Sequence, residues 1–430
     1  FGSSLFLCRN LLHHPGHPRK YPKILFSQKT AQTPLFMAAI TRNVLRAVGS
    51  ASSTMTCAKH VAKAFPPALA AAAPGFVAPR RHFAGRVGWE EGQDVDLDSV
   101  AYGFMASQAL FSGLELNIFD SIAEAGEAGA SLKQIQEATG VSAPRLQTLL
   151  TALVSVKCLR RSPEGLYVNS PNTSQYMVSS SRHFYGDYLK FQIGRQFYHR
   201  MGALPDVMTT GQAPSYASWF SDPEVAQTYT QAQHNGSVAT AKYLVKKKLS
   251  LEGVKDMLDV GGGSGAFSYV FAGAVPGLKS TVLELPEVCR TAETIKAQQS
   301  EDVQSRVNFV ELDATSPDWP VQDAAFDVVL MSYISGSVPE AIIADLYSNA
   351  YKALRPGGRL LVHDFMVNDS LDGPALGALW GLQHVTVNAD GLGLCPKEII
   401  DRFGKAGFDT SKCDTKEMIH GMTKLVVAQK

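Results

Sequence analysis

Hydrophobic and polar positions change their spacing at about residue 254. Beyond it, short apolar runs alternate with stretches of helical spacing such as residues 266–274. Short apolar runs bounded by glycine or charged residues are typical of strands, and their alternation with helices favours a doubly wound, mainly parallel sheet. The runs that predict strands are 254–260, 280–285, 306–312, 325–331, 359–367 and 424–428. We therefore predict an α/β domain over residues 186–430, which begins with a helical connector.

The pattern before residue 186 predicts a smaller, mostly helical domain over residues 95–185. The expected elements are helices at 97–122, from Ser131 as N-cap, and at 144–156, followed by short strands at 158–161 and 166–168. Three helices followed by a hairpin form a winged-helix pattern, which serves either DNA binding or dimerisation. The third helix is almost entirely apolar, so it favours dimerisation or covering of a substrate over the reading of bases.

The first 83 residues differ from the rest in charge. No Asp or Glu precedes Glu90, and residues 1–83 hold 11 Lys and Arg, whereas the remainder carries 29 basic and 39 acidic residues, a net charge of −10. From Met37 the segment is rich in Ala, Ser and Arg, and it ends in Arg81-His82-Phe83-Ala84-Gly85, which resembles a matrix-processing site. We expect residues 1–83 to be a targeting segment that directs the protein to the mitochondrial matrix. The alternatives are a segment that directs it to the plastid and a disordered basic tail.

The bulk composition narrows the class of protein. The 430 residues are 45% hydrophobic and 18% charged, which fits two globular domains and an extension. The acidic main body argues against nucleic-acid binding, because phosphates need basic surface. We expect no membrane span, since no apolar run is long enough. The six cysteines form no C-x-x-C pair and predict neither a disulfide framework nor a metal site.

Glycines and acids follow the first three predicted strands. Gly261 and Gly263 follow the first strand, and Asp259 is placed to order their loop or to meet the amino group of a ligand. Glu284 ends the second strand, where a carboxylate accepts from ribose hydroxyls, and Asp313 follows the third, where it would accept from an adenine amino group. Ligands of such folds bind at the carboxyl ends of the strands. The pattern predicts an adenosine-containing ligand, either S-adenosylmethionine or, less well matched, a nicotinamide dinucleotide.

Several segments together resemble the small-molecule O-methyltransferase family, whose Rossmann-like domain uses S-adenosylmethionine. They are Leu258-Asp259-Val260-Gly261-Gly262-Gly263-Ser264-Gly265, Leu283-Glu284-Leu285-Pro286, Phe326-Asp327-Val328-Val329-Leu330-Met331 and the turn at 354–360. The family includes acetylserotonin, plant phenolic and bacterial polyketide methyltransferases, and its winged-helix domains interlock in a homodimer. The resemblance covers about residues 95–430. It implies a homodimer, S-adenosylmethionine as cofactor, and further cofactor contacts at Ser237 and Ser332.

The residues expected to catalyse methyl transfer depart from the pattern of that family. The family has a His-Asp pair just after the fourth strand, and this chain has Gly336 and Ser337 there. The family segment with an orienting Glu corresponds to residues 391–396, which contain no acid. The remaining candidates for a general base are His363, Asp364 and His384, with a structural role as the alternative for each.

Three functions fit these observations. The first is methyl transfer to the hydroxyl of a small aromatic or quinone-like acceptor, which proximity alone supports when the acceptor is acidic. The second is a catalytically silent subunit or assembly factor of a mitochondrial complex, which the missing His-Asp pair motivates. The third is another reaction that uses the bound cofactor. Tyr216, Trp219 and Phe220 are expected either to line an acceptor pocket or to pack in the core.

Overall fold

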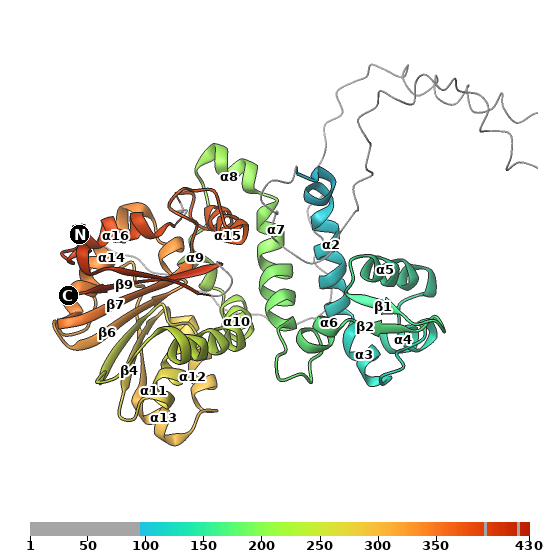
Figure 1. Cartoon of the computed structure of the whole chain (residues 1–430), viewed down its shortest axis with the longest axis horizontal. Helices are drawn as coiled ribbons and strands as arrows, with labels where there is room; N and C mark the ends of the chain where they lie inside the picture. Colours follow the sequence, from blue (N-terminus) through green and yellow to red (C-terminus); the bar gives the residue numbers. More distant parts are fainter. Residues whose placement is uncertain (1–94, 391–393, 419–421) are drawn as a thin grey trace, which may run out of the picture. The chain divides into compact units, whose positions relative to one another are not determined.

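The computed structural model describes residues 95–390, 394–418 and 422–430. The expected targeting segment at 1–83 lies outside the described residues, as do residues 391–393 of the segment expected to orient the base. Figure 1 shows a helical N-terminal domain in blue and green, and a C-terminal domain built around one sheet.

The N-terminal domain consists of short helices and one hairpin. Its elements are α2 (Leu97–Glu115), α3 (Ile118–Glu124), α4 (Leu132–Thr139), α5 (Ala143–Ser155), β1 (Leu159–Arg161), β2 (Tyr167–Asn169) and α6 (Pro171–Tyr176). The single helix predicted over 97–122 is wrong, because Asn117 adopts a left-handed conformation, with φ of 51°, between α2 and α3. The Ser131 cap is confirmed: Ser131 Oγ accepts from the Gln134 N–H, and Oε1 of Gln134 accepts from the Ser131 N–H.

The apolar character of the third predicted helix has a structural explanation. Leu146, Leu150 and Leu153 of α5 are all fully buried in the core of the domain. The apolar residues of α5 therefore hold the domain together, and the hairpin of β1 and β2 pairs antiparallel beside it, as predicted.

A run of helices connects the two domains. The elements are η3 (Tyr188–Phe197), α7 (Tyr198–Met201), α8 (Leu204–Thr210), α9 (Tyr216–Phe220), α10 (Pro223–Tyr243) and η4 (Leu244–Lys248). Both η3 and η4 are π-helical, a widened geometry that is frequent at functional sites. Asp222 caps α10 by accepting from the N–H groups of Glu224 and Val225.

The C-terminal domain contains a mixed seven-stranded sheet in the order β5-β4-β3-β6-β7-β9-β8. The strands are β3 (Asp256–Val260), β4 (Lys279–Glu284), β5 (Val307–Glu311), β6 (Phe326–Ser332), β7 (Leu354–Phe365), β8 (Asp414–Glu417) and β9 (Thr423–Gln429). All six predicted strands form, and β9 is antiparallel to both of its neighbours. Sequence reasoning missed β8, because its residues are polar and mostly exposed at the sheet edge. The strand order reverses beside β3, which opens a crevice at the carboxyl ends of the strands.

Helices cover both faces of the sheet. They are α11 (Ala266–Ala274), α12 (Pro286–Lys296), α13 (Glu301–Arg306), α14 (Glu340–Ala353), α15 (Ala375–Val385) and α16 (Pro396–Lys405), with the short 3-10 helices η5 (Ser335–Ser337) and η6 (Thr410–Lys412). Two hydrophobic clusters fill the domain, one with α14 and α16 and the other with α11 and η4. The sheet is therefore buried on both faces, which explains its nearly continuous apolar strands.

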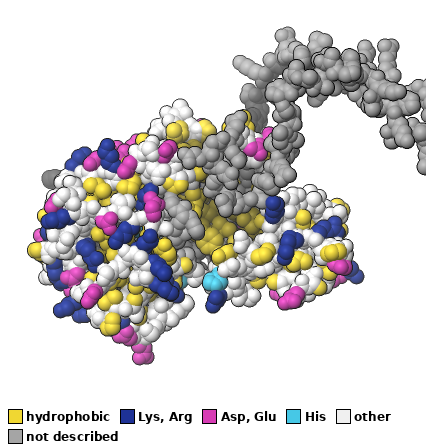
Figure 2. Space-filling model, viewed as in Figure 1, with side chains coloured by type: hydrophobic (Ala, Val, Ile, Leu, Met, Phe, Trp, Pro, Cys, Tyr) yellow, Lys and Arg dark blue, Asp and Glu magenta, His cyan; other side chains and the backbone are white. Residues whose placement is uncertain are grey.

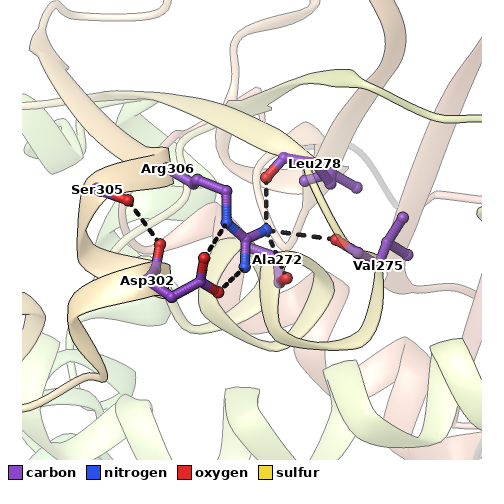
Figure 3. Close-up of polar contacts among 6 residues, drawn as sticks. All are labelled: Ala272, Val275, Leu278, Asp302, Ser305 and Arg306. Atoms are coloured by element: carbon purple, nitrogen blue, oxygen red, sulfur yellow. Dashed lines mark hydrogen bonds and ion pairs between the residues drawn. The ribbon is translucent and has the colours of Figure 1, made fainter.

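Arg306 fixes the helix that follows the glycine loop. Its Nη1 donates to the carbonyl oxygens of Ala272, Val275 and Leu278, at 2.7, 3.3 and 2.9 Å (Figure 3). Its other guanidinium nitrogens pair with Asp302. Two of these carbonyls belong to the last turn and C-cap of α11, where a cation compensates unpaired carbonyl groups. Arg306 therefore holds the far end of the helix whose first residue follows the glycines.

The surface of the described part is mixed in charge. Figure 2 shows Lys and Arg interspersed with Asp and Glu over the C-terminal domain, and hydrophobic side chains gathered around the helix that η3 and α7 form. On α2, more than half of each of these apolar side chains is exposed: Leu97, Val100, Tyr102, Phe104 and Met105. Contiguous apolar surface of this kind marks a site of interaction. Among the described helices, none has the length and apolar content needed to cross a bilayer.

Candidate functional site

Glycine is required at the turn between β3 and α11 for its backbone conformation. Gly261, Gly263 and Gly265 have φ of 63°, 57° and 78°, in the left-handed region that other residues rarely adopt. A Cβ atom on Gly261 would lie 2.6 Å from Cδ1 of Ile334, whereas a Cβ on Gly263 would meet nothing within 4 Å. The loop is therefore packed against the segment after β6 at Gly261 and open at Gly263.

Asp259 lies near the end of β3 and is fully buried. Its Oδ2 accepts from Oγ of Ser268 at 2.6 Å, and a Cβ on Gly262 would lie 2.7 Å from its Cγ. Burial raises the pKa of Asp259 to about 6, and its Oδ1 has no hydrogen-bond partner among the described residues. Of the two roles expected for Asp259, these contacts support the ordering of the loop. They also leave one carboxylate oxygen unpaired.

Glu284, the last residue of β4, is tied to the same loop. Its carboxylate accepts from the N–H of Gly263, at 3.2 Å, and from the N–H of Leu285. Burial raises the pKa of Glu284 to about 7, and the nearby carboxylates of Asp259 and Asp313 act in the same direction. A carboxylate held by two backbone donors still has lone pairs for the hydroxyl groups of a ligand.

A cavity of about 330 Å³ lies at the carboxyl ends of the strands. Its walls include all seven residues predicted to contact the cofactor: Ser237, Asp259, Gly261, Gly263, Glu284, Asp313 and Ser332. Asp313 accepts from the N–H and the hydroxyl of Thr315, at 2.9 and 2.6 Å, which shapes the turn after β5. The fold thus brings these residues together from α10, from β3, β4 and β6, and from the loops after β3 and β5. Their contact with a cofactor stays a prediction.

Sequence reasoning missed two residues beside this cavity. Nδ1 of His234, on α10, lies 2.8 Å from Oγ of Ser264 in the glycine loop, and Ile334 packs against Gly261. His234 lies three residues before Ser237 and so on the same face of the helix, a spacing that could have indicated it. Ile334 had no comparable signal, because only the tertiary fold brings it to the loop.

A second cavity, of about 1190 Å³, adjoins the first. Five residues line both cavities: Tyr216, Tyr229, Gln233, Ser237 and Tyr333. Phe365 and Trp380 contribute to the wall of the larger one, and their rings are stacked with centroids 4.5 Å apart. The stacked rings suit a planar aromatic ligand, and the rest of the wall includes many polar and charged groups, such as Arg182 and Lys242.

The three aromatic residues expected to line an acceptor pocket or to pack in the core occupy different positions. Tyr216 lines both cavities and Phe220 lines the smaller one. Trp219 lines neither cavity. Its ring packs against Phe220, and the guanidinium of Arg200 stacks over it in a cation–π contact, 3.9 Å from the ring centroid. Tyr216 and Phe220 thus lie at the cavities, while Trp219 supports them from behind.

Gly336, which stands where the family has its histidine, lies in η5. Its N–H donates to Oδ2 of Asp364, on β7, at 3.3 Å. Asp364 also accepts from the N–H of Phe365 and lines the larger cavity, and burial raises its pKa to about 7. The carboxylate of Asp364 therefore holds the turn that carries Gly336 and Ser337.

The two histidine candidates have different surroundings. His363 is fully buried and lines neither cavity; its Nδ1 lies 2.9 Å from Oγ of Ser332, and burial lowers its pKa to about 3. His384, on α15, lines the larger cavity, and burial lowers its pKa to about 4. The structure thus places His384 and Asp364 at the larger cavity, and His363 within the sheet.

The chain matches the models of two domain families, the O-methyltransferase dimerisation domain over residues 99–179 and the O-methyltransferase domain over residues 197–409. Acetylserotonin O-methyltransferase of Homo sapiens is 30% identical over 329 residues, which span 73% of this chain and 91% of that protein. The tetracenomycin polyketide synthesis 8-O-methyl transferase of Streptomyces glaucescens is 27% identical over 321 residues, with 73% and 91% covered.

Solved structures agree on the fold. Human N-acetylserotonin methyltransferase in complex with SAM matches with a TM-score of 0.69 at 24% identity, covering 80% of this chain and 99% of that chain. The structure of PigF with SAH matches with a TM-score of 0.67 at 22% identity, covering 79% and 100%. The fold is therefore the predicted α/β methyltransferase fold, preceded by a helical dimerisation domain. With the family resemblance confirmed, the chain belongs to the S-adenosylmethionine-dependent O-methyltransferases that act on small molecules.

Proposed function

We propose that this chain transfers a methyl group from S-adenosylmethionine to the hydroxyl of a small aromatic or quinone-like acceptor. The observation that carries the proposal is the junction of the two cavities. One is walled by the glycine loop and the strand-end acids, the other by stacked aromatic rings, and Ser237 and Tyr333 line both. A donor and an acceptor bound side by side need little further ordering to react.

The smaller cavity fits S-adenosylmethionine. Gly263 leaves the loop backbone open, and the carboxylate of Glu284 is available to ribose hydroxyls. Oδ1 of Asp259 lacks a partner, which suits an ammonium group, and Asp313 would accept from the adenine amino group. When bound, the cofactor supplies an electrophilic methyl group on its sulfonium sulfur.

The residues of the larger cavity would hold the acceptor. The stacked rings of Phe365 and Trp380 offer a flat apolar surface to an aromatic ring. Tyr216, Tyr229 and Tyr333 are partly buried phenols whose pKa values desolvation raises, so they remain neutral hydrogen-bonding groups. Together they would orient the acceptor hydroxyl toward the smaller cavity.

Calorimetric titration of the full chain with S-adenosylmethionine and S-adenosylhomocysteine tests the first half of the proposal. We expect micromolar binding, and loss of binding in Gly263→Trp, because the indole would occupy the open side of the loop. A screen of phenolic and catechol acceptors, read out as S-adenosylhomocysteine formed, tests the second half. A folded wild-type chain that binds neither compound would exclude the proposed activity.

A catalytically silent role is the second candidate, because Gly336 and Ser337 replace the expected His-Asp pair. In that role the chain would be a structural subunit or assembly factor of a mitochondrial complex. Affinity purification from mitochondria would then recover it in a large assembly, and the acceptor screen would give no product. Turnover with any acceptor would remove this alternative.

The mitochondrial matrix remains our proposed location, with the plastid as the alternative. The proposal depends on the acid-free composition of residues 1–83 and on the segment Arg81-His82-Phe83-Ala84-Gly85. Import into isolated mitochondria, with cleavage near Phe83, is the expected result. A chain that stays outside the organelle and uncleaved would contradict it.

A further inference from the structure

An imidazole fills the space beside Gly336. A Cβ atom built on Gly336 would lie 2.4 Å from both Cε1 and Nδ1 of His384. His384 belongs to α15, a different element from the η5 turn that carries Gly336. The Nδ1–Cε1 edge of the ring therefore occupies the place into which any side chain at position 336 would project. A residue larger than glycine at 336 and the present position of His384 exclude each other.

The imidazole of His384 lies at the wall of the larger cavity, beside Trp380, and the centroids of the two rings are 6.1 Å apart. His384 is only 6% exposed to solvent. The ring nitrogens make no hydrogen bond to any described residue. Because Nδ1 and Cε1 face the Gly336 backbone, Nε2 is the nitrogen available to a group in the cavity.

The neighbouring candidates are engaged elsewhere. Nδ1 of His363 is paired with Ser332 inside the sheet, and Asp364 is occupied by the N–H groups of Gly336 and Phe365. Among the three residues considered as a base, His384 alone lines the cavity and has no hydrogen bond within the described structure.

We propose that His384 is the general base for the acceptor hydroxyl, so that α15 supplies the imidazole that position 336 lacks. This proposal rests on the proposed methyl transfer. In the step, the acceptor O–H bond breaks and its proton passes to Nε2 of His384. The oxygen electron pair forms the new O–CH₃ bond while the methyl–sulfur bond breaks, and S-adenosylhomocysteine and the methylated acceptor leave. The proton on Nε2 is then released to water.

Several titratable groups line the cavity together with His384. Asp364 on β7, Tyr333 after β6 and Tyr216 on α9 are among them, and the others are Tyr176, Arg182, His183, Tyr185, Tyr188, Tyr229 and Lys242. The η5 turn contributes no titratable side chain, and Asp206, on the neighbouring α8, is exposed. Burial lowers the pKa of His384 to about 4, so its imidazole is neutral and carries a free lone pair at physiological pH. Because the same burial disfavours the imidazolium, the proposed transfer needs the oxyanion formed beside the ring, and the carboxylate of Asp364 in the same cavity, to stabilise the cation.

The first experiment uses 4-nitrocatechol, a phenol whose absorption reports its ionisation, added to the full chain saturated with S-adenosylhomocysteine. At a pH just below the pKa of the free probe, we expect the wild-type chain to bind a larger ionised fraction of the probe than His384→Asn does. The double variant Gly336→His with His384→Ala returns the imidazole to position 336 and should restore the larger ionised fraction. Equal spectra for wild type and His384→Asn would overturn the role of His384.

The second experiment measures turnover with an acceptor from the screen. We expect kcat to fall about 100- to 1000-fold in His384→Asn, with KM changed only a few-fold. We also expect the turnover rate of the His384→Asn variant to increase with pH, because solvent hydroxide would then remove the proton of the acceptor hydroxyl. His199→Asn is the matched control, since His199 is exposed on α7 and lines neither cavity.

Melting temperature and S-adenosylhomocysteine affinity verify that each variant is folded. A His384→Asn variant that keeps the wild-type kcat and pH profile refutes the base while leaving the methyltransferase proposal intact. A wild-type chain that binds no phenol and methylates none refutes both proposals together. Rescue of kcat by the double variant Gly336→His with His384→Ala supports the base, because a purely structural histidine would not be replaced from position 336.

Discussion

Glu284 holds the glycine loop and is also the residue predicted to contact the ribose of the cofactor. Its carboxylate accepts from the N–H of Gly263 and the N–H of Leu285, and burial still raises its pKa to about 7. The protonated form loses acceptor capacity that ribose hydroxyls would use. We therefore predict that the ionisation of this single residue makes cofactor binding depend on pH in the physiological range.

We expect the affinity for S-adenosylmethionine to increase as the pH rises from about 6 to about 8, because Glu284 becomes ionised through its pKa of about 7. Asp259, with a pKa of about 6, adds to the lower part of this rise. Glu284→Gln should weaken binding about 10- to 100-fold at the upper pH and flatten the dependence above about pH 7.

Calorimetry across this pH range measures both effects. Asp364→Asn is the control, since Asp364 titrates in the same range but lines only the larger cavity. Unchanged affinity in Glu284→Gln would mean that Glu284 does not contact the cofactor.

At the scale of elements, the position of the glycine loop depends on how α11 is anchored at its far end. Arg306, from α13, donates to three carbonyl groups at and beyond the end of α11 and pairs with Asp302. Without the guanidinium, these partly buried carbonyls would lose their partners, which costs more than a surface ion pair contributes. The helix and the loop at its start are therefore stabilised together.

Arg306→Met should lower the free energy of unfolding by about 2–3 kcal/mol, because it removes charge-assisted hydrogen bonds while keeping most of the side-chain volume. Denaturant titration of the full chain gives the value. Arg290→Met is the matched control on α12. Arg290 is exposed and, among the residues that the structure describes, pairs only with Glu287, so we expect a change within about 0.5 kcal/mol. Similar losses in both variants would show that Arg306 has no special anchoring role.

At the scale of the whole molecule, the exposed apolar side chains of α2 lead us to predict a homodimer. Leu97, Val100 and Phe104 follow one another at helical spacing and are 70%, 52% and 53% exposed. The family model of a dimerisation domain covers all but the start of this helix. A second copy of the chain would remove these side chains from water, as in obligate dimers.

Phe104→Glu is expected to convert the dimer to a monomer at micromolar concentration, because it places a charge in an apolar interface. Light scattering coupled to size-exclusion chromatography measures the mass. Lys133→Glu changes an exposed residue on α4 of the same domain and should leave the dimer intact. A wild-type monomer, or a Phe104→Glu dimer of unchanged stability, would contradict this assignment of the interface.

Local sequence signals were sufficient to predict much of the structure of this protein. The glycine loop, the acids at the strand ends and the six predicted strands follow from backbone conformation and apolar periodicity, which act over a few residues. The family resemblance added Ser237 and Ser332, which line the same cavity as Asp259 and Glu284. These features could be predicted because each depends on neighbours in the chain.

Other features depend on contacts between distant segments. The break at Asn117 and the polar edge strand β8 lack a periodic pattern, so tertiary packing decides both. The position of His384 against Gly336 is of the same kind. The sequence alone determined that position 336 carries no side chain, but only the packing of α15 against η5 placed an imidazole in the space, because steric exclusion acts between atoms that the fold brings together.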